Sequence, residues 1–398
     1  MSQLNYLEKL LDGVDVEWKP LDDISVKISS GGTPKTGVAE FYDGDIPWLR
    51  TQEVNFDEIW DTGVKITEAG VDNSSAKWIP ANCIIVAMYG ATVGKIGINK
   101  IPMTTNQACA NIQLDGNIAN YRYVFHFLLS QYEYIKSLGS GSQTNINAGI
   151  VKKLVVPIPC PDNPEKSLAI QAEIVRILDA FTALTAELTA ELNLRKKQYN
   201  YYRDQLLCFE EGDVEWKTLG DLAENLDSKR KPITSGLREV GEIPYYGASG
   251  IVDYVKDYIF DGDYLLVSED GANLLARNTP IAFSISGKTW VNNHAHVLKF
   301  ETYAERKYVE YYLNSIDLTP YISGAAQPKL NKKNLESINI PNPAPKEKER
   351  IVATLDKFDS LTCSIKEGLP REIELRQKQY EYYRDLLLSF PNIEEAAA

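Results

Sequence analysis

The longest regular pattern in this chain is an apolar stripe along residues 165–209. Its apolar positions recur mainly at steps of three and four: Ile170, Ile174, Ile177, Phe181, Leu184, Leu188, Leu192, Tyr199, Tyr202 and Leu206. Such spacing places these side chains on one face of an α-helix. The stripe therefore predicts an amphipathic helix of roughly 60 Å, at about 1.5 Å per residue.

Most of this segment is written a second time at residues 346–390. Both copies end with the motif Q-Y-x-Y-Y-R-D, within Leu194–Leu207 and Leu375–Leu388. Their beginnings, Ile174–Phe181 and Ile351–Phe358, also match, but the beginnings lie 177 positions apart and the ends 181, so the second copy has four extra residues. Since neither helix can bury its stripe alone, we expect an antiparallel coiled pair. Two unrelated helices in separate cores would leave the shared motif unexplained.

Each long helix follows a segment rich in Gly, Pro, Asn and short β-type runs. Both segments begin with D-V-E-W-K, and further short matches follow in the same order in each. These are Ile46-Pro-Trp48 with Ile243-Pro-Tyr245, Gly90-Ala91 with Gly271-Ala272, Asn106-Gln-Ala108 with Asn293-His-Ala295, Gln143-x-x-Ile-Asn147 with Gln327-x-x-Leu-Asn331, and Ile158–Pro161 with Ile340–Pro343. We interpret the segments as distant copies of one domain.

The repeats predict a division of the chain into six parts. A short helix at 1–14 resembles a continuation of the last helix, and a tail occupies 391–398. Between them we expect a domain at 15–160, a helix at 161–212, a second domain at 213–344 and a second helix at 345–390. The fold class is α+β, with approximate two-fold symmetry inside one chain.

Composition limits the possible classes of protein. A chain of 398 residues can form two or three domains with full cores. We find no leader peptide and no membrane span, and five scattered cysteines fit reduced thiols in a cytoplasmic protein. A net charge of −13 argues at face value against a nucleic-acid partner. Residues 26–157, however, hold eleven basic and eleven acidic side chains, so the excess acid lies elsewhere.

The chain resembles the DNA-specificity subunits of type I restriction-modification enzymes over essentially its whole length. The resemblance rests on these segments and on the two repeated helices: Gly31-Gly-Thr-Pro34, Ile46-Pro-Trp48, Gly90-Ala-Thr-Val-Gly-Lys95, Asn106-Gln107, and Ile158–Pro161 with Gln171 and Ile174. It departs where Lys229-Arg-Lys-Pro232 replaces Gly31–Pro34 and Lys348 replaces Gln171. These departures imply that the two domains read different sequences.

The resemblance carries expectations about function. It implies that each domain is a target-recognition domain for one half of a bipartite double-stranded DNA site. It also implies that the long helices hold the domains apart and dock two methyltransferase subunits, with restriction subunits joining through that core. S-adenosylmethionine would then bind the methyltransferase subunits, and ATP and Mg²⁺ the restriction subunits. We expect no cofactor and no metal on this chain, which makes it non-catalytic.

Two motifs nevertheless invite a catalytic reading. Gly90–Lys95 looks like a phosphate loop, but a Walker A loop has four residues between its glycines and Ser or Thr after the lysine. We therefore predict a structural turn between strands, from which Lys95 reaches a DNA phosphate. His294-x-His296 resembles half a metal site, yet His126 is the one other histidine in the sequence and the cysteines do not cluster.

The candidate DNA contacts come from loops of both domains. Lys229, Arg230 and Lys231 form a dense basic run suited to phosphates, and the alternative is a solvated charge cluster. Gln143, Thr144 and Asn145 lie in a loop before the exit of the first domain, and Gln327 with Lys329 holds the same place in the second. Gln and Asn side chains can hydrogen-bond to an adenine edge, and Lys or Arg side chains to a guanine. The alternative is that the Asn and Gln side chains cap a turn. The full set is Thr33, Lys35, Arg50, Lys95, Gln143, Thr144, Asn145, Lys229, Arg230, Lys231, Gln327 and Lys329.

The first long helix also contains a tandem tetrapeptide, Thr185–Leu188 followed by Thr189–Leu192. Four residues make slightly more than one helical turn, so each unit returns leucine to nearly the same face. We hypothesise that the units form a ruler that sets the gap between the half-sites, and the alternative is duplicated helix-forming sequence. Two other functions stay open: a scaffold or adhesin-like protein that never touches nucleic acid, and a regulatory subunit without a nuclease partner.

Overall fold

The computed structural model describes residues 13–139, 145–210, 212–324, 327–362, 364 and 367–390. The chain divides into two compact units, residues 1–187 with 374–398, and residues 188–373. Each unit contains one domain and parts of the long helices, and we call residues 15–160 domain 1 and residues 213–344 domain 2. The expected tail at 391–398, and the expected N-terminal helix apart from its last two residues, lie outside the described residues.

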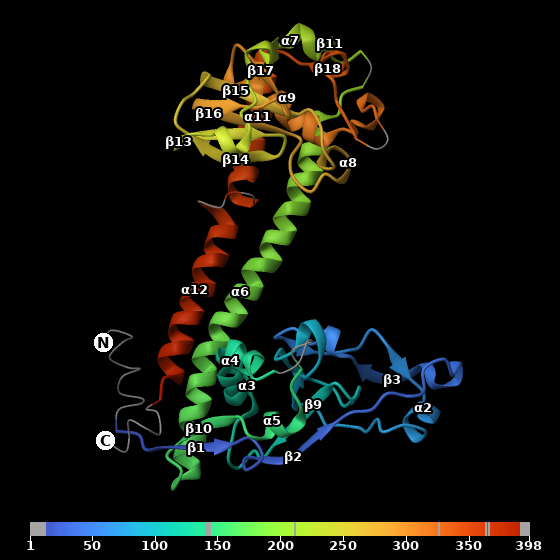
Figure 1. The fold of residues 1–398 in the computed structure, drawn as a ribbon, viewed down its shortest axis with the longest axis vertical. Coiled ribbons are helices and arrows are strands. Elements are labelled where there is room, and N and C mark those ends of the chain that lie inside the picture. Colours follow the sequence, from blue (N-terminus) through green and yellow to red (C-terminus); the bar gives the residue numbers. More distant parts are fainter. Residues whose placement is uncertain are drawn as a thin grey trace. The chain divides into compact units, whose positions relative to one another are not determined.

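Domain 1 is built on a five-stranded sheet of order β2-β9-β6-β7-β4. The domain also contains a separate three-stranded sheet of order β5-β3-β8, whose strand β3 is labelled in Figure 1. The central strand β6 reads Ile-Ile-Val-Ala and is buried throughout, as a short apolar run of β-branched residues predicts. The strands are β1 Val16–Pro20, β2 Ser25–Ser30, β3 Tyr42–Leu49, β4 Glu58–Ile59, β5 Lys65–Ile66, β6 Ile84–Ala87, β7 Ile96–Asn99, β8 Thr104–Thr105, β9 Cys109–Leu114 and β10 Val155–Pro159. The helices are α2 Glu68–Asp72, α3 Tyr121–Ser130, α4 Tyr132–Ser137 and α5 Ala148–Lys152.

Domain 2 is built on a six-stranded sheet of order β12-β17-β15-β16-β13-β14. The helix α9 packs on this sheet through the same apolar core (Figure 1). The strands are β11 Glu215–Thr218, β12 Glu224–Asn225, β13 Val240–Gly247, β14 Gly250–Val255, β15 Phe260–Ser268, β16 Ala282–Val291, β17 Ala295–Lys299 and β18 Asn339–Asn342. The helices are α7 Leu219–Leu222, α8 Asn273–Ala276, α9 Tyr303–Ser315 and α10 Lys332–Glu336.

The repeated D-V-E-W-K phrase forms the entry strand of each domain. In domain 1 it is β1, which pairs antiparallel with the exit strand β10 and sets Trp18 opposite Pro157. In domain 2 it is β11, which pairs with β18 and sets Trp216 opposite Pro341. Each domain is thus closed by its own first and last strands, immediately before the chain enters a long helix.

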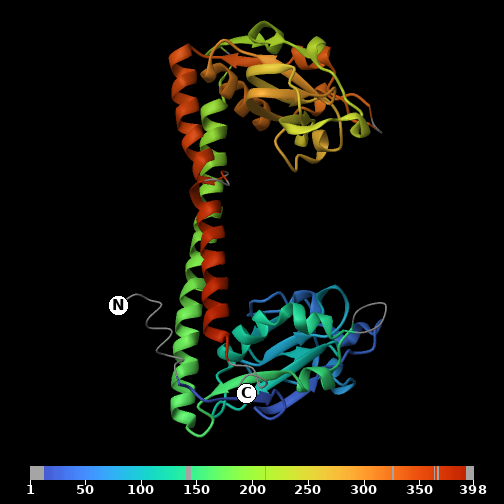
Figure 2. The same ribbon diagram turned by 60° about the vertical axis from the view of Figure 1, so that its left-hand side comes forward.

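The long helices pack antiparallel within each unit. The helix α6, Pro164–Leu207, spans 44 residues and contributes to both units. In the first unit it runs alongside α12, Gly368–Leu388, and Phe181 stacks on Tyr383 with ring centroids 5.2 Å apart (Figures 1 and 2). In the second unit it packs against α11, Pro345–Thr362, where Tyr202 stacks on Phe358 at 5.6 Å. The two stacks join equivalent residues of the repeat, which confirms the shared seam.

The prediction of one continuous helix over 346–390 is wrong, because α11 ends at Thr362 and α12 begins at Gly368. Gly368 has a φ of +78°, and a Cβ there would lie 2.3 Å from the Ser360 carbonyl oxygen. Only glycine accepts this backbone angle and this approach easily. Pro370 follows, and proline is tolerated only in the first turn of a helix. The break falls where the second copy carries its four extra residues.

Each domain shares its core with the helices that leave it. In the first unit Ile174 and Leu178 of α6 and Leu387 of α12 are fully buried against the sheet and α3. In the second unit Ile351 and Leu355 of α11 are buried with the side chains of α9. Full burial of each such side chain contributes about 1.5–3 kcal/mol. The described helices include none that is long and apolar enough to cross a membrane.

Candidate nucleic-acid interface

Several loops of domain 1 meet at one end of its main sheet, and we call them the loop edge of domain 1. They are residues 31–35 after β2, residue 50 after β3, residues 88–95 between β6 and β7, residues 106–108 before β9, and residue 145. Backbone hydrogen bonds connect them: Gly32 N to Thr105 O at 2.9 Å, Asn106 N to Leu49 O at 2.9 Å, Met88 N to Ala108 O at 2.8 Å, and Ile146 N to Met88 O at 3.0 Å.

The same arrangement recurs in domain 2, whose loop edge comprises residues 227–232, 247–249, 269–272, 292–294 and 327–329. The equivalent hydrogen bonds are Asn292 N to Tyr246 O at 3.0 Å, Glu269 N to His294 O at 2.9 Å, and Leu330 N to Glu269 O at 2.8 Å. These bonds correct the sequence alignment by one position, since Asn292 and not Asn293 is equivalent to Asn106. The side-chain oxygen of each of these asparagines also accepts from the amide two residues on.

The structure brings five predicted residues of domain 1 to this edge. Thr33 hydrogen-bonds to Gln107, and Lys35 is exposed. Arg50 forms a 3.5 Å ion pair with Glu53, and the Asn145 side-chain oxygen accepts from the Gly90 amide at 3.3 Å. Gln143 and Thr144 lie outside the described residues. Asn145 therefore fits the capping alternative, since its oxygen ties its own segment to the glycine turn.

The Gly90–Lys95 segment is a structural turn, as predicted. It joins the antiparallel strands β6 and β7, and Gly90 and Gly94 have φ values of +75° and +80°. The ammonium group of Lys95 donates to the Asn55 side chain at 2.7 Å and lies 5.5 Å from the ring centre of Phe56. Phe56 has a φ of +62°, which is unusual for a bulky residue. Nothing in the sequence pattern signalled this neighbour.

The basic run of domain 2 is split by the structure. Lys229 and Lys231 are exposed, whereas the Arg230 side chain is 12% exposed and turned inward. Its guanidinium donates to Glu269 at 2.6 Å and to the Ala295 carbonyl at 2.8 Å, and lies 3.3 Å from Asp227. Arg230 thus does not fit the expectation of a solvent-facing phosphate contact, because buried carboxylates already hold its charge.

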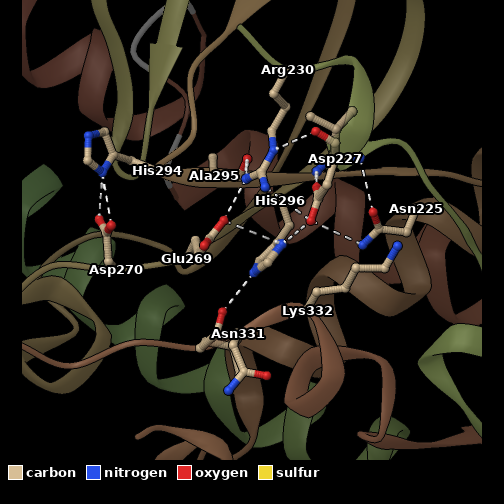
Figure 3. A network of polar contacts seen from close by, with 12 residues as sticks. Asn225, Asp227, Arg230, Glu269, Asp270, His294, Ala295, His296, Asn331 and Lys332 are labelled. Carbon is tan, nitrogen blue, oxygen red and sulfur yellow. Dashed lines mark hydrogen bonds and ion pairs between the residues drawn. The ribbon is translucent and has the colours of Figure 1, made fainter. Parts of the chain in front are cut away.

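The partners of Arg230 belong to a larger polar network (Figure 3). His296 points one ring nitrogen at Asp227, at 2.6 Å, and the other at the Leu330 carbonyl, at 2.7 Å. The Lys329 ammonium lies 3.0 Å from Glu269, so this predicted residue and the exposed Gln327 also sit at the loop edge. Asp227, Glu269 and His296 thereby form one buried group at the centre of the edge.

Charge pairing dominates this buried group. Burial alone would raise the pKa of the Asp227 carboxyl, but hydrogen bonds from His296 and the Val297 amide, with the charges of His296 and Arg230, bring it below its ordinary value. Burial would likewise raise the pKa of the Glu269 carboxyl, but the hydrogen bonds from Arg230 and Lys329 outweigh burial and lower this pKa.

These three residues have ligand atoms within 4.8 Å of one another, which a metal ion could use. A metal would have to displace Arg230, which pairs with both carboxylates and, together with Lys329, balances their charge. The other histidine of the H-x-H motif, His294, is no co-ligand, because it pairs instead with Asp270, at 2.9 Å.

The tandem tetrapeptide lies in the middle of α6. Leu188 and Leu192 are half-buried, Thr189 is exposed, and the Thr185 hydroxyl donates to the Phe181 carbonyl at 2.9 Å. Both leucines therefore share one side of the helix, as four-residue spacing requires. The described geometry does not measure spacing on DNA, so the ruler stays a hypothesis.

Sequence reasoning missed a pair of residues that join domain to helix. Asp179 accepts from Arg122 at 2.6 and 2.8 Å and from His126 at 2.8 Å. The equivalent Asp356 accepts from the hydroxyls of Tyr303 and Tyr311, at 2.8 and 2.6 Å. The sequence did contain a signal for this pair, since both aspartates occupy the same position in the matched helix beginnings.

Comparisons with known proteins agree with this architecture. A family model described as "Type I restriction modification DNA specificity domain" matches residues 13–195 and 211–375. The chain is 40% identical to the type I restriction enzyme EcoR124I/EcoR124II specificity subunit of Escherichia coli, with 99% of each chain covered. It is 38% identical to the EcoprrI specificity subunit of Escherichia coli, covering 92% of this chain and 93% of the relative. The fold matches a type I restriction-modification S subunit from M. genitalium, with a TM-score of 0.61 at 16% identity over 96% of this chain and 98% of that one.

Proposed function

This chain belongs to the type I restriction modification DNA specificity family, and we propose that its two loop edges are the surfaces that read DNA. As a specificity subunit it recognises a bipartite DNA target for the methyltransferase and restriction subunits of the enzyme. One observation supports the assignment of the loop edges as DNA-reading surfaces. The two domains share the backbone hydrogen bonds of the loop edge, yet the residues that these bonds hold in place have different side chains.

The side chains available at each edge suit DNA. Thr33, Lys35 and Lys95 in domain 1, and Lys229 and Lys231 in domain 2, supply hydroxyl and ammonium donors for phosphates and base edges. They differ in number and in position on the loops between the domains, so each edge reads its own half-site. A local gathering of cations also reconciles DNA binding with the net charge of −13.

Exchange of one domain tests this function. Residues 15–160 would be replaced by those of a relative with a different target, and the methylated sites of cells carrying the complete system would be sequenced. We expect one half of the site to change and the other to stay the same. A change in both halves, or in neither, would contradict independent reading by the two domains.

We propose further that two methyltransferase subunits dock on a repeated stripe of the long helices. Leu194 and Tyr201 of α6 are 60% and 62% exposed, and the equivalent Leu375 and Tyr382 of α12 are 43% and 56% exposed. A spacing of seven residues puts each pair on one helix face. Two similar apolar patches on one chain support two copies of one partner.

Native mass spectrometry of the assembled complex can count these partners. Tyr201→Asp or Tyr382→Asp alone should leave one methyltransferase subunit bound, and the double variant should leave none. The matched control is Lys196→Asp, on an exposed residue about 140° round the helix from Tyr201. Two bound copies in the double variant would show that partners dock elsewhere.

The catalytic machinery, on this proposal, belongs to those partners. S-adenosylmethionine is placed with the methyltransferase subunits, and ATP and Mg²⁺ with the restriction subunits. The family membership of this chain supports the division, since specificity subunits are generally non-catalytic.

A further inference from the structure

A single network, buried except at Lys329, ties together three of the loops that form the edge of domain 2 (Figure 3). Arg230 comes from the loop after β12, Glu269 from the end of β15, and Lys329 from the segment before α10. Glu269 bonds both cations, Arg230 at 2.6 Å and Lys329 at 3.0 Å. His296 on β17 adds contacts to Asp227 and to the Leu330 carbonyl. These ion pairs and hydrogen bonds thus connect three separate loops with the strand β17.

Domain 1 has none of these charges at the equivalent positions. Shared strand register and backbone bonds equate Glu269 with Met88, His296 with Ala110, and Lys329 with Asn145. Met88 and Ala110 are buried apolar residues. The backbone hydrogen bonds that the two loop edges share therefore do not depend on the network, since domain 1 forms them without it.

Domain 1 anchors its first loop by close backbone approach instead. A Cβ on Gly31 would lie 2.0 Å from the Thr105 carbonyl oxygen, and one on Gly32 would lie 2.3 Å from the Ala76 amide nitrogen. Neither position has room for a side chain. In domain 2 the run Lys229-Arg-Lys-Pro232 replaces these glycines, so the loop cannot be fastened in the same way. Arg230 supplies the fastening that the glycines supply in domain 1.

We propose that this network positions the recognition loops of domain 2, with Arg230 as its central positioning residue for reading the second half-site. This inference rests on the proposed function of the loop edge. Buried charges contribute little net stability, and their constraint is geometric. Because Arg230 turns inward, its neighbours Lys229 and Lys231 are left exposed on the outer side of the loop. Loss of Arg230 would free that loop from Glu269 and so from the Lys329 segment.

The test uses the full chain assembled with its methyltransferase subunits, once domain exchange has shown which half-site domain 2 reads. Affinities are measured for the target duplex and for duplexes altered in one half-site at a time, which gives a discrimination ratio for each half. Arg230→Met and Glu269→Gln should lower the ratio of the second half-site by about tenfold or more. The ratio of the first half-site should stay within about twofold. Arg230→Lys should recover part of the loss, because lysine keeps the charge but lacks the rigid planar fork with which the guanidinium reaches both carboxylates and the Ala295 carbonyl.

A destabilised control separates positioning from stability. Leu313→Ala empties a fully buried site in the core of domain 2, on α9, and should lower the melting temperature while both ratios persist well below that temperature. The inference is overturned if Arg230→Met keeps both ratios, or if Leu313→Ala loses discrimination to the same extent. Absence of any discrimination by the unaltered complex would instead overturn the proposed function itself.

Discussion

Replacement of Asp179 should cost the first unit more free energy of unfolding than replacement of Asp356 costs the second. Both aspartates occupy the same position in the repeated helix beginnings, but they face different partners. Asp179 receives three hydrogen bonds from Arg122 and His126, and His126 is almost completely buried. Asp356 receives two hydrogen bonds, both from neutral tyrosine hydroxyls.

The magnitudes follow from what each substitution leaves behind. Asp179→Ala takes one carboxylate partner from the Arg122 guanidinium, which keeps Glu58, and one from the buried His126 imidazole, which keeps Tyr380. Hydrogen bonds to charged groups contribute about 1.5–3 kcal/mol each, so we expect a loss of about 3–6 kcal/mol. Asp356→Ala releases the exposed Tyr303 hydroxyl to water and takes the charged acceptor from the buried Tyr311 hydroxyl, so we expect a loss of about 1.5–3 kcal/mol. For units of this size, about 2–4 °C of melting temperature corresponds to each kcal/mol. The first variant should therefore lose about 6–24 °C and the second about 3–12 °C.

The effect of Asp179 should also depend on pH. Burial alone would raise the pKa of its carboxyl, but the hydrogen bonds and charges of His126 and Arg122 bring it below the ordinary value. A folded-state pKa below the unfolded value of about 3.9 stabilises the fold above that pH, and the contribution is lost as pH falls through the folded pKa. The gap between wild type and Asp179→Asn should thus be full at pH 6 and close below about pH 4.

Calorimetry of the full chain measures these transitions, and hydrogen exchange of peptides from α3 and α9 assigns each loss to its unit. Asp179→Asn is the matched variant, since it keeps the shape and one acceptor oxygen but removes the charge. Equal losses for the alanine variants of the two aspartates, or a loss at Asp179 below about 1 kcal/mol, would refute the reasoning from partner charge.

Three further predictions concern DNA and catalysis. Lys229→Ala with Lys231→Ala should reduce the slope of log affinity against log salt by about 2, measured by titration at several salt concentrations, and an unchanged slope would remove these lysines from the phosphate contacts. A third tetrapeptide after Leu192 should lengthen α6 by roughly 6 Å and turn it by about 40°. One base pair advances DNA by about 3.4 Å and 35°, so the rotation matches one base pair, whereas the extra length has to be absorbed by bending or repacking of the helices. Sequencing of methylated sites should show unchanged half-sites one base pair further apart, and methylation at the original spacing would end the ruler hypothesis. The isolated chain should neither transfer methyl groups nor bind S-adenosylmethionine, and methyl transfer by the highly purified chain would contradict this division of labour.

The parts of the fold that repeat could be predicted from the sequence. The repeated apolar stripes predicted that the two helices pack on each other, because an apolar stripe has to be covered by another. The structure confirms this packing with the stacks of Phe181 on Tyr383 and of Tyr202 on Phe358. The glycines of the Gly90–Lys95 segment marked its turn, since the chain needs positive φ there. A repeat and a pair of glycines can both be recognised in the sequence itself. The repeat correctly predicted the paired helices, and the glycines correctly predicted the turn.

The sequence also contains a signal for the break between α11 and α12, but the repeat favours one continuous helix. Gly368 and Pro370 stand inside the segment that carries the four extra residues, and both residues favour a helix boundary. The match with the first helix, which is continuous, argued for one helix instead. A repeat shows which elements correspond, whereas glycine and proline decide locally where each one stops.

The inward turn of Arg230 could not be predicted, because it depends on residues distant in sequence. Glu269 is 39 positions away and the Ala295 carbonyl is 65. A run of three basic residues looks like one solvent-facing surface until the tertiary fold supplies carboxylates to one member of the run. The same limit applies to the recognised bases. The framework that repeats is fixed by backbone bonds such as those of Asn106 and Asn292, which both domains share. The side chains that differ, such as Met88 and Glu269, depend for their role on what surrounds them, so recognition has to be derived separately for each domain.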